Sequence, residues 1–127
     1  MRLALDTNTY RAFMDGDTEA VKTLKSAEGI FIPVPVLAEL RFGFMKGTRG
    51  RQNEASLIKL LDSPRVEVLN CDQQTTQFYA QLKLQLSRQG TPIPINDVWI
   101  AALVVQHGLI LYSLDSDFDK LAQLPRC

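Results

Sequence analysis

The chain has 127 residues, of which 46% are hydrophobic and 22% are charged, and its 14 lysines and arginines balance its 14 aspartates and glutamates. This length and composition are typical of one folded domain spanning residues 1–127, and they argue against a disordered or disulfide-stapled chain. The neutral net charge excludes a protein that wraps nucleic acid with a uniformly basic surface, so any such contact must be local.

The first half of the chain alternates short apolar runs with helical patterns. Leu3–Leu5 should form a buried strand, and Thr7 or Asn8 could cap the helix after it. We then expect helices over residues 10–14 and 18–27, a strand over residues 30–32 that Pro33 stops, and helices over residues 35–47 and 51–61. Pro64 breaks the last of these helices.

The second half continues the same alternation. We expect a strand over residues 66–69, a long helix over residues 71–89 that Gly90 ends, and a helix that begins near Asp97, with Asn96 as its cap, and ends at Gly108. A strand over residues 109–113 and a short helix over residues 117–121 follow. Strands that alternate with helices predict an α/β fold with a mainly parallel sheet between helices.

Four acidic residues lie in apolar or turn contexts where a charge is costly. Asp6 and Asp115 each follow a predicted strand, Glu39 interrupts the apolar run 34–40, and Asp97 opens the apolar run 98–105. Each alone could be a helix cap, a partner of a helix dipole or a surface residue. Ligands of parallel sheets bind beyond the carboxyl ends of the strands, and the joint pattern therefore favours one site there.

Buried carboxylates need partners, and no lysine or arginine is an obvious partner for all four. A shared divalent cation with oxygen ligands, Mg²⁺ or Mn²⁺, is the economical explanation. Such a site is typical of metal-assisted phosphoryl chemistry. The only histidine, His107, lies near the end of an apolar helix, which disfavours a ribonuclease that depends on histidine.

A cluster of basic residues follows Glu39 in the sequence and comprises Arg41, Lys46, Arg49 and Arg51. These side chains could bind RNA phosphates, or they could be a solvated helix end and turn.

Phe42, Phe44 and Leu82 are apolar residues that one small domain would leave partly uncovered, so self-association into a homodimer is expected. No apolar run approaches the length of a membrane-spanning helix or a signal peptide, and we expect a cytoplasmic protein without membrane contact.

Four segments resemble, in order and spacing, the successive motifs of PIN-domain nucleases, and more narrowly those of VapC-type toxins from bacterial toxin–antitoxin pairs. They are residues 5–8, 37–43, 95–102 and 111–118, so the resemblance covers nearly the whole chain. It implies a three-layer α/β sandwich with a mainly parallel central sheet. It also implies an endoribonuclease dependent on Mg²⁺ or Mn²⁺ that hydrolyses RNA, with tRNA as one candidate, and so inhibits translation. A small antitoxin partner and a homodimer are further implications.

Carried over by position, Asp6, Glu39 and Asp97 match the three acids of the family's metal site, and Asp115 matches the fourth, more variable acid. Asp117 is a candidate additional ligand, and Thr7, Asn8 and Ser113 are candidates for supporting these carboxylates. Ser113 stands where the family usually has threonine. The chain stops soon after Leu124, where relatives often continue into a final strand.

Three other functions differ from the one that this resemblance implies. A phosphoacceptor signalling domain would require paired acids after the first strand and a lysine after a late strand, and this chain has Asp6-Thr7-Asn8 and Ser113-Leu114-Asp115 there. An aspartate-nucleophile phosphatase would require a second aspartate in place of Asn8. A catalytically silent PIN-like module that binds only protein would not need all four acids, and their retention favours an enzyme.

Overall fold

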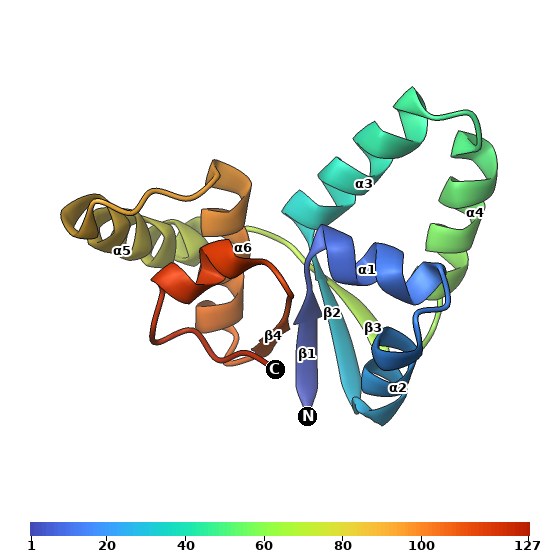
Figure 1. The fold of residues 1–127 in the computed structure, drawn as a ribbon, viewed down its shortest axis with the longest axis horizontal. Helices are drawn as coiled ribbons and strands as arrows, with labels where there is room; N and C mark the ends of the chain where they lie inside the picture. Colours follow the sequence, from blue (N-terminus) through green and yellow to red (C-terminus); the bar gives the residue numbers. More distant parts are fainter.

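The computed structural model describes residues 1–127 and has an α/β fold, as predicted, with four parallel strands in one sheet (Figure 1). In chain order the elements are β1 (Arg2–Leu5), α1 (Thr7–Met14), α2 (Thr18–Ser26), β2 (Gly29–Pro33), α3 (Val34–Lys46), α4 (Gly50–Leu61), β3 (Val66–Leu69), α5 (Gln73–Gln89), α6 (Ile95–Gln106), β4 (Ile110–Tyr112) and the 3-10 helix η1 (Ser116–Lys120). No helix is both long and apolar enough to cross a membrane.

The strand order β3-β2-β1-β4 reverses direction at β1. The chain moves from β1 to β2 and β3 on one side, and α5 and α6 then carry it back to β4 on the other side of β1. Because parallel crossovers are right-handed, this reversal puts α1–α4 on one face of the sheet and α5 and α6 on the opposite face (Figure 1). The carboxyl ends of β1 and β4, where the order reverses, are therefore the expected position of a ligand.

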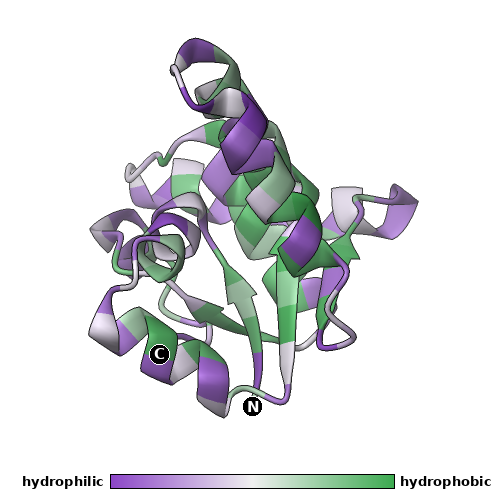
Figure 2. Cartoon of the chain, turned by 90° about the vertical axis from the view of Figure 1, so that its right-hand side faces the viewer, coloured by the Kyte–Doolittle hydropathy of each residue, from purple (hydrophilic) through white to green (hydrophobic).

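The sheet and α6 form the centre of the core. Leu3 of β1 pairs with Ile30 of β2 and with Ile110 of β4, and the inner residues of β1 are fully buried. Helix α6 buries six of its residues, Val98 and the run 100–104, which explains why its sequence lacks a polar face. Figure 2 shows the same distribution, with hydrophobic colour on most of the sheet and hydrophilic colour on much of the surrounding helices.

Two predicted helix caps are wrong. The cap of α1 is Asp6, and neither Thr7 nor Asn8 takes that position because the helix already includes both. Helix α6 begins at Ile95, so Asn96 lies inside its first turn and caps nothing. Pro94 occupies the cap position of α6 and offers no side-chain hydrogen bond, but its fixed backbone suits the residue that precedes a helix.

The last residues of the chain extend the sheet beyond β4. The amide of Leu111 donates to the carbonyl of Pro125 at 2.9 Å, and the amide of Cys127 donates to the carbonyl of Leu111 at 3.1 Å. Residue Arg126 thus pairs in parallel with Leu111 as an isolated bridge. The sequence did not predict what pairs with β4 at this edge of the sheet, and in the structure the C-terminal residues do so.

Candidate active site

A cleft of about 620 Å³ opens at the carboxyl ends of β1 and β4, where the strand order reverses. Its lining includes all four of the acids singled out in the sequence, and two basic residues, Arg11 and Lys46. The full lining is Asp6, Thr7, Asn8, Arg11, Glu39, Phe42, Gly43, Lys46, Pro94, Ile95, Asn96, Asp97, Ile100 and Asp115. Asp6 follows β1 directly and Asp115 lies three residues after the end of β4, while α3 contributes Glu39 and α6 contributes Asp97.

Asp6 is the most buried acid of the cleft, with 5% of its surface exposed. Its Oδ1 accepts from the amide of Thr9 at 2.9 Å, and its Oδ2 accepts from the hydroxyl of Ser113 at 2.5 Å. The hydroxyl of Thr9 lies 2.9 Å from both Asp6 Oδ1 and the carbonyl of Tyr112, and it accepts from the Asp6 amide. Asp6 is therefore fixed from both sides, by α1 and by the segment after β4.

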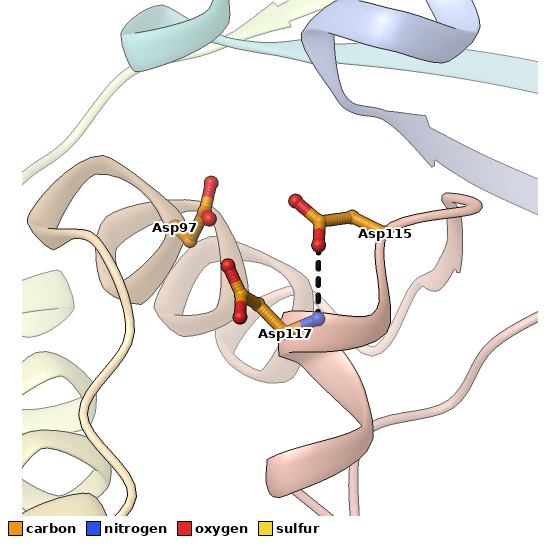
Figure 3. A group of neighbouring side chains, drawn as sticks. All are labelled: Asp97, Asp115 and Asp117. Carbon is orange, nitrogen blue, oxygen red and sulfur yellow. Dashed lines mark hydrogen bonds between the residues drawn. The ribbon is translucent and has the colours of Figure 1, made fainter.

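Three carboxylates lie close together, and two of them, Asp97 and Asp115, line the cleft. One oxygen from each of Asp97, Asp115 and Asp117 lies within 4.8 Å of the others, and Figure 3 shows the three side chains facing a common space between α6 and η1. The carboxylate of Asp115 caps η1 by accepting from the amide of Asp117 at 2.9 Å. Asp117 also pairs with Lys120, at 3.3 Å, and it does not line the main cleft.

The crowding has a marked effect on Asp97. Burial, followed by the charges of Asp115, Glu39, Asp117 and Asp6, raises the pKa of Asp97 from 3.8 to about 6. Both causes act in the same direction, because burial and neighbouring negative charge each disfavour the ionised form. A cation placed among these carboxylates would remove that penalty.

The predicted basic cluster does not act as one group. Lys46 lines the cleft and lies over the ring of Phe42, 4.7 Å from its centre. Arg41 forms a two-point ion pair with Glu54 of α4, with its shortest contact at 2.9 Å, and does not line the cleft. Arg49 borders a neighbouring cleft, and Arg51 is an exposed residue of α4 that lines neither.

Three contributors to the site were not found from the sequence. Arg11 lines the cleft from the last turn of α1, and Thr9 holds Asp6 as described. Arg126, from the C-terminal tail, donates to the carbonyls of Ser113 at 2.9 Å and Asp115 at 3.0 Å, and it pairs with Asp119. A signal for Thr9 existed, because Asp6-x-x-Thr9 is a capping-box pattern, but nothing local to Arg126 indicates its target.

The sequence matches the PIN domain family over residues 3–124. The chain belongs to the PIN-domain family. It is 30% identical over 120 residues to Ribonuclease VapC5 of Mycobacterium tuberculosis, an alignment that covers 92% of this chain and 85% of that protein. It is 28% identical over 125 residues to Ribonuclease VapC2 of Rickettsia felis, covering 94% of this chain and 92% of that protein.

Among solved structures, this PIN domain is similar to one chain of VapBC2 from Rickettsia felis bound to a DNA fragment from its promoter. The TM-score is 0.87 at 26% identity, and the match covers 100% of this chain and 98% of that chain. The PIN-like fold and the VapC-type resemblance predicted from the sequence are thereby confirmed. These similarities do not favour a phosphoacceptor domain or a silent binding module.

Proposed function

We propose that this PIN domain is the toxin of a VapC-type toxin–antitoxin pair, an endoribonuclease that hydrolyses RNA and thereby inhibits translation in the cytoplasm. The observation that carries the proposal is the convergence of Asp6, Glu39, Asp97 and Asp115 in one cleft at the reversal of strand order. Two of its relatives are named as ribonucleases, and these names indicate the class of reaction, RNA cleavage.

A divalent cation fits the donor set of this cleft. All candidate ligands are oxygen atoms, which Mg²⁺ and Mn²⁺ prefer, and the three-carboxylate group of Asp97, Asp115 and Asp117 is compact enough for one ion. Thr7 lines the cleft, and its buried hydroxyl oxygen has no hydrogen-bond partner in the protein, so a polar atom beside the acids is left uncompensated by protein groups. A bound cation would lower the pKa of a water molecule and offset charge on the phosphate.

The residues of the chain have distinct parts in this reaction. Asp6, held by Thr9 and Ser113, is a fixed ligand whose carboxylate cannot turn away from the cleft. Asp97 must lose its proton before it can bind a cation, so cation binding releases a proton near pH 6. Arg11 and Lys46 offer positive charge to the RNA phosphate, without which the acids would repel it. No histidine lines the cleft, so the nucleophile is water activated among carboxylates.

An antitoxin is the second expected partner, because the similar solved structures are described as VapBC and toxin–antitoxin complexes. Helix α3 exposes Phe42 at 62% and Met45 at 85% beside the cleft, which is an apolar surface for such a protein. A basic side chain of the antitoxin would pair with the acids in place of the cation.

A homodimer remains a proposal, although one of the residues offered for its interface is wrong. Leu82 is only 5% exposed and belongs to the core, because α5 packs that side against the rest of the domain. Phe42 remains exposed and Phe44 is partly buried. Sedimentation at micromolar concentration tests the dimer, and a monomer alone would contradict it.

The test of the enzymatic proposal is cleavage of a labelled RNA by the purified chain in Mg²⁺ or Mn²⁺. Glu39→Gln should abolish cleavage, whereas the matched variant Glu67→Gln, at an exposed position of β3 outside the cleft, should cleave like the wild type. Asp6→Asn and Asp97→Asn should also abolish cleavage. Near wild-type rates in these three variants would contradict the assignment of the site.

The toxin proposal has a separate test in cells. Expression of the wild-type chain should arrest growth and translation, and co-expression of its antitoxin should restore both. Asp6→Asn at matched soluble level should be harmless. Equal harmlessness of the wild type would contradict the toxin role and leave the nuclease role to be decided by the cleavage assay.

A further inference from the structure

A second cleft of about 450 Å³ adjoins the acidic cleft and lies between α1, α3 and α4. Arg11 and Gly43 line both clefts, so the two meet at this point. The second cleft is lined by Tyr10, Arg11, Met14, Asp15, Gly43, Phe44, Arg49, Asn53 and Ser56. It contains two arginines and one carboxylate, whereas the first contains four carboxylates, so the charge changes sign at the junction.

The charge of Arg11 is not paired within the protein. None of the ion pairs in the protein includes its guanidinium. It lies against the bare backbone of α3 at Gly43, where an added Cβ would come within 2.9 Å of Arg11 Nη2. A side chain at position 43 would therefore push the guanidinium away from the junction.

Arg49 is the second free cation of this surface. Its Nε donates to Gln52 at 3.0 Å, which orients the side chain but leaves the two terminal nitrogens available. The neighbouring Arg41 is different, because Glu54 already occupies its guanidinium. Asn53 and Ser56 of α4 add neutral groups that can hydrogen-bond to sugars or bases.

We propose that this second cleft is a subsite for the RNA backbone, in which Arg11 and Arg49 bind phosphates next to the scissile one. The inference rests on the proposed endoribonuclease function and adds the direction in which the substrate extends. Arg11 follows Thr7, and Gly43 follows Glu39, by four residues, so each lies about 6 Å further along its helix than Thr7 or Glu39. Arginine suits this position because its planar fork binds phosphate through two hydrogen bonds.

The test uses RNA binding in an Asp6→Asn background, where the substrate stays intact and asparagine still caps α1. The probe is a fluorescein-labelled single-stranded oligoribonucleotide. Arg11→Gln and Arg49→Gln should each weaken binding about five- to tenfold and reduce the slope of log affinity against log salt by about 0.7. The control is Arg88→Gln, an exposed arginine of α5 that lines neither cleft and should bind like the parent.

Two further variants separate a phosphate subsite from general loss of charge. Gly43→Ala keeps both arginines but displaces the Arg11 guanidinium, so it should weaken RNA binding while the thermal stability of the helix is kept or increased. Arg49→Gln in the otherwise wild-type enzyme should raise KM for the long oligoribonucleotide. It should leave cleavage of a dinucleoside monophosphate unchanged, because that compound contains the scissile phosphate alone.

The possible outcomes are distinguishable. If the wild type cleaves RNA and the arginine variants bind the long probe as tightly as Arg88→Gln does, the subsite is overturned and the nuclease function stands. If RNA binding is unchanged but the antitoxin inhibits these variants less well, the cleft serves a protein partner and the subsite is again overturned. If the wild type neither binds nor cleaves RNA, the proposed function itself fails.

Discussion

The raised pKa of Asp97 makes a quantitative prediction about stability without metal. The pKa is about 6 in the folded protein and 3.8 ordinarily, so the folded state binds more protons between these values. Stability therefore falls as pH rises through this range, and the loss is complete above pH 6. The full difference corresponds to about 3 kcal/mol, and because Asp97 is only half buried, solvent screening should reduce it to about 1 to 2 kcal/mol.

Asp97→Asn removes this penalty. In EDTA at about pH 7 the variant should be about 1 to 2 kcal/mol more stable than the wild type, and at about pH 4 the two should be nearly equal because Asp97 is then protonated. Added Mg²⁺ should narrow this difference at neutral pH. At about ten times its dissociation constant, the ion would stabilise the wild type by about 1.4 kcal/mol and the variant by less.

The assay is urea denaturation followed by circular dichroism, across this pH range, with EDTA or Mg²⁺. The matched control is Asp62→Asn, an exposed acid at the end of α4 that lines neither cleft. Equal stability of Asp97→Asn and the wild type at neutral pH in EDTA would refute the raised pKa of Asp97. A stability difference that does not change with pH would refute it as well. A stabilising effect of Mg²⁺ that is the same in both proteins would refute the role of Asp97 as a ligand.

Other perturbations test the geometry of the site. Thr9→Val leaves the Asp6 amide and the Tyr112 carbonyl without a buried partner, and it should lower the free energy of unfolding by about 2 to 3 kcal/mol; a loss below that of an exposed Thr76→Val control would contradict it. Arg41→Gln breaks an exposed ion pair, so it should cost less than about 1 kcal/mol and leave RNA affinity unchanged in a binding titration. Arg126→Gln should lower the cleavage rate more than it lowers the melting temperature, because it frees the carbonyls beside Asp115; unchanged cleavage would contradict this. Asp115→Asn, which keeps one oxygen, should reduce cleavage less than Asp6→Asn does, and an equal loss would show that the acids are ranked wrongly.

The order of elements could be predicted because local signals agree. Apolar runs of strand length lie between helical patterns, and Pro33, Pro64 and Gly90 mark the boundaries. The structure has a strand and a helix at each expected place, and Gly90 ends α5 with a φ of 69°, as a glycine at that position should. The position of Asp6 and Asp115 at one edge also follows from a rule of parallel sheets.

The partners of the surface cations could not be predicted, because they depend on how helices pack. Arg41 and Arg11 are both exposed arginines in helices, but only Arg41 meets a carboxylate, that of Glu54, thirteen residues later on α4. The packing of α4 against α3 decides this contact, and no local pattern records it. The prediction that Asn96 caps α6 is wrong for a different reason. Pro94 occupies the cap position, so the helix begins earlier than the capping pattern suggests.

On the proposed function, the acids of the cleft cut RNA internally with the help of a divalent cation. The most direct measurement is mapping of the new RNA ends after total bacterial RNA is incubated with the purified wild type or with Asp6→Asn. We predict a small number of discrete internal cuts that appear only with the wild type and disappear in EDTA. The same cuts with Asp6→Asn, the same cuts in EDTA, or no cuts by the wild type in Mg²⁺ or Mn²⁺ would contradict it.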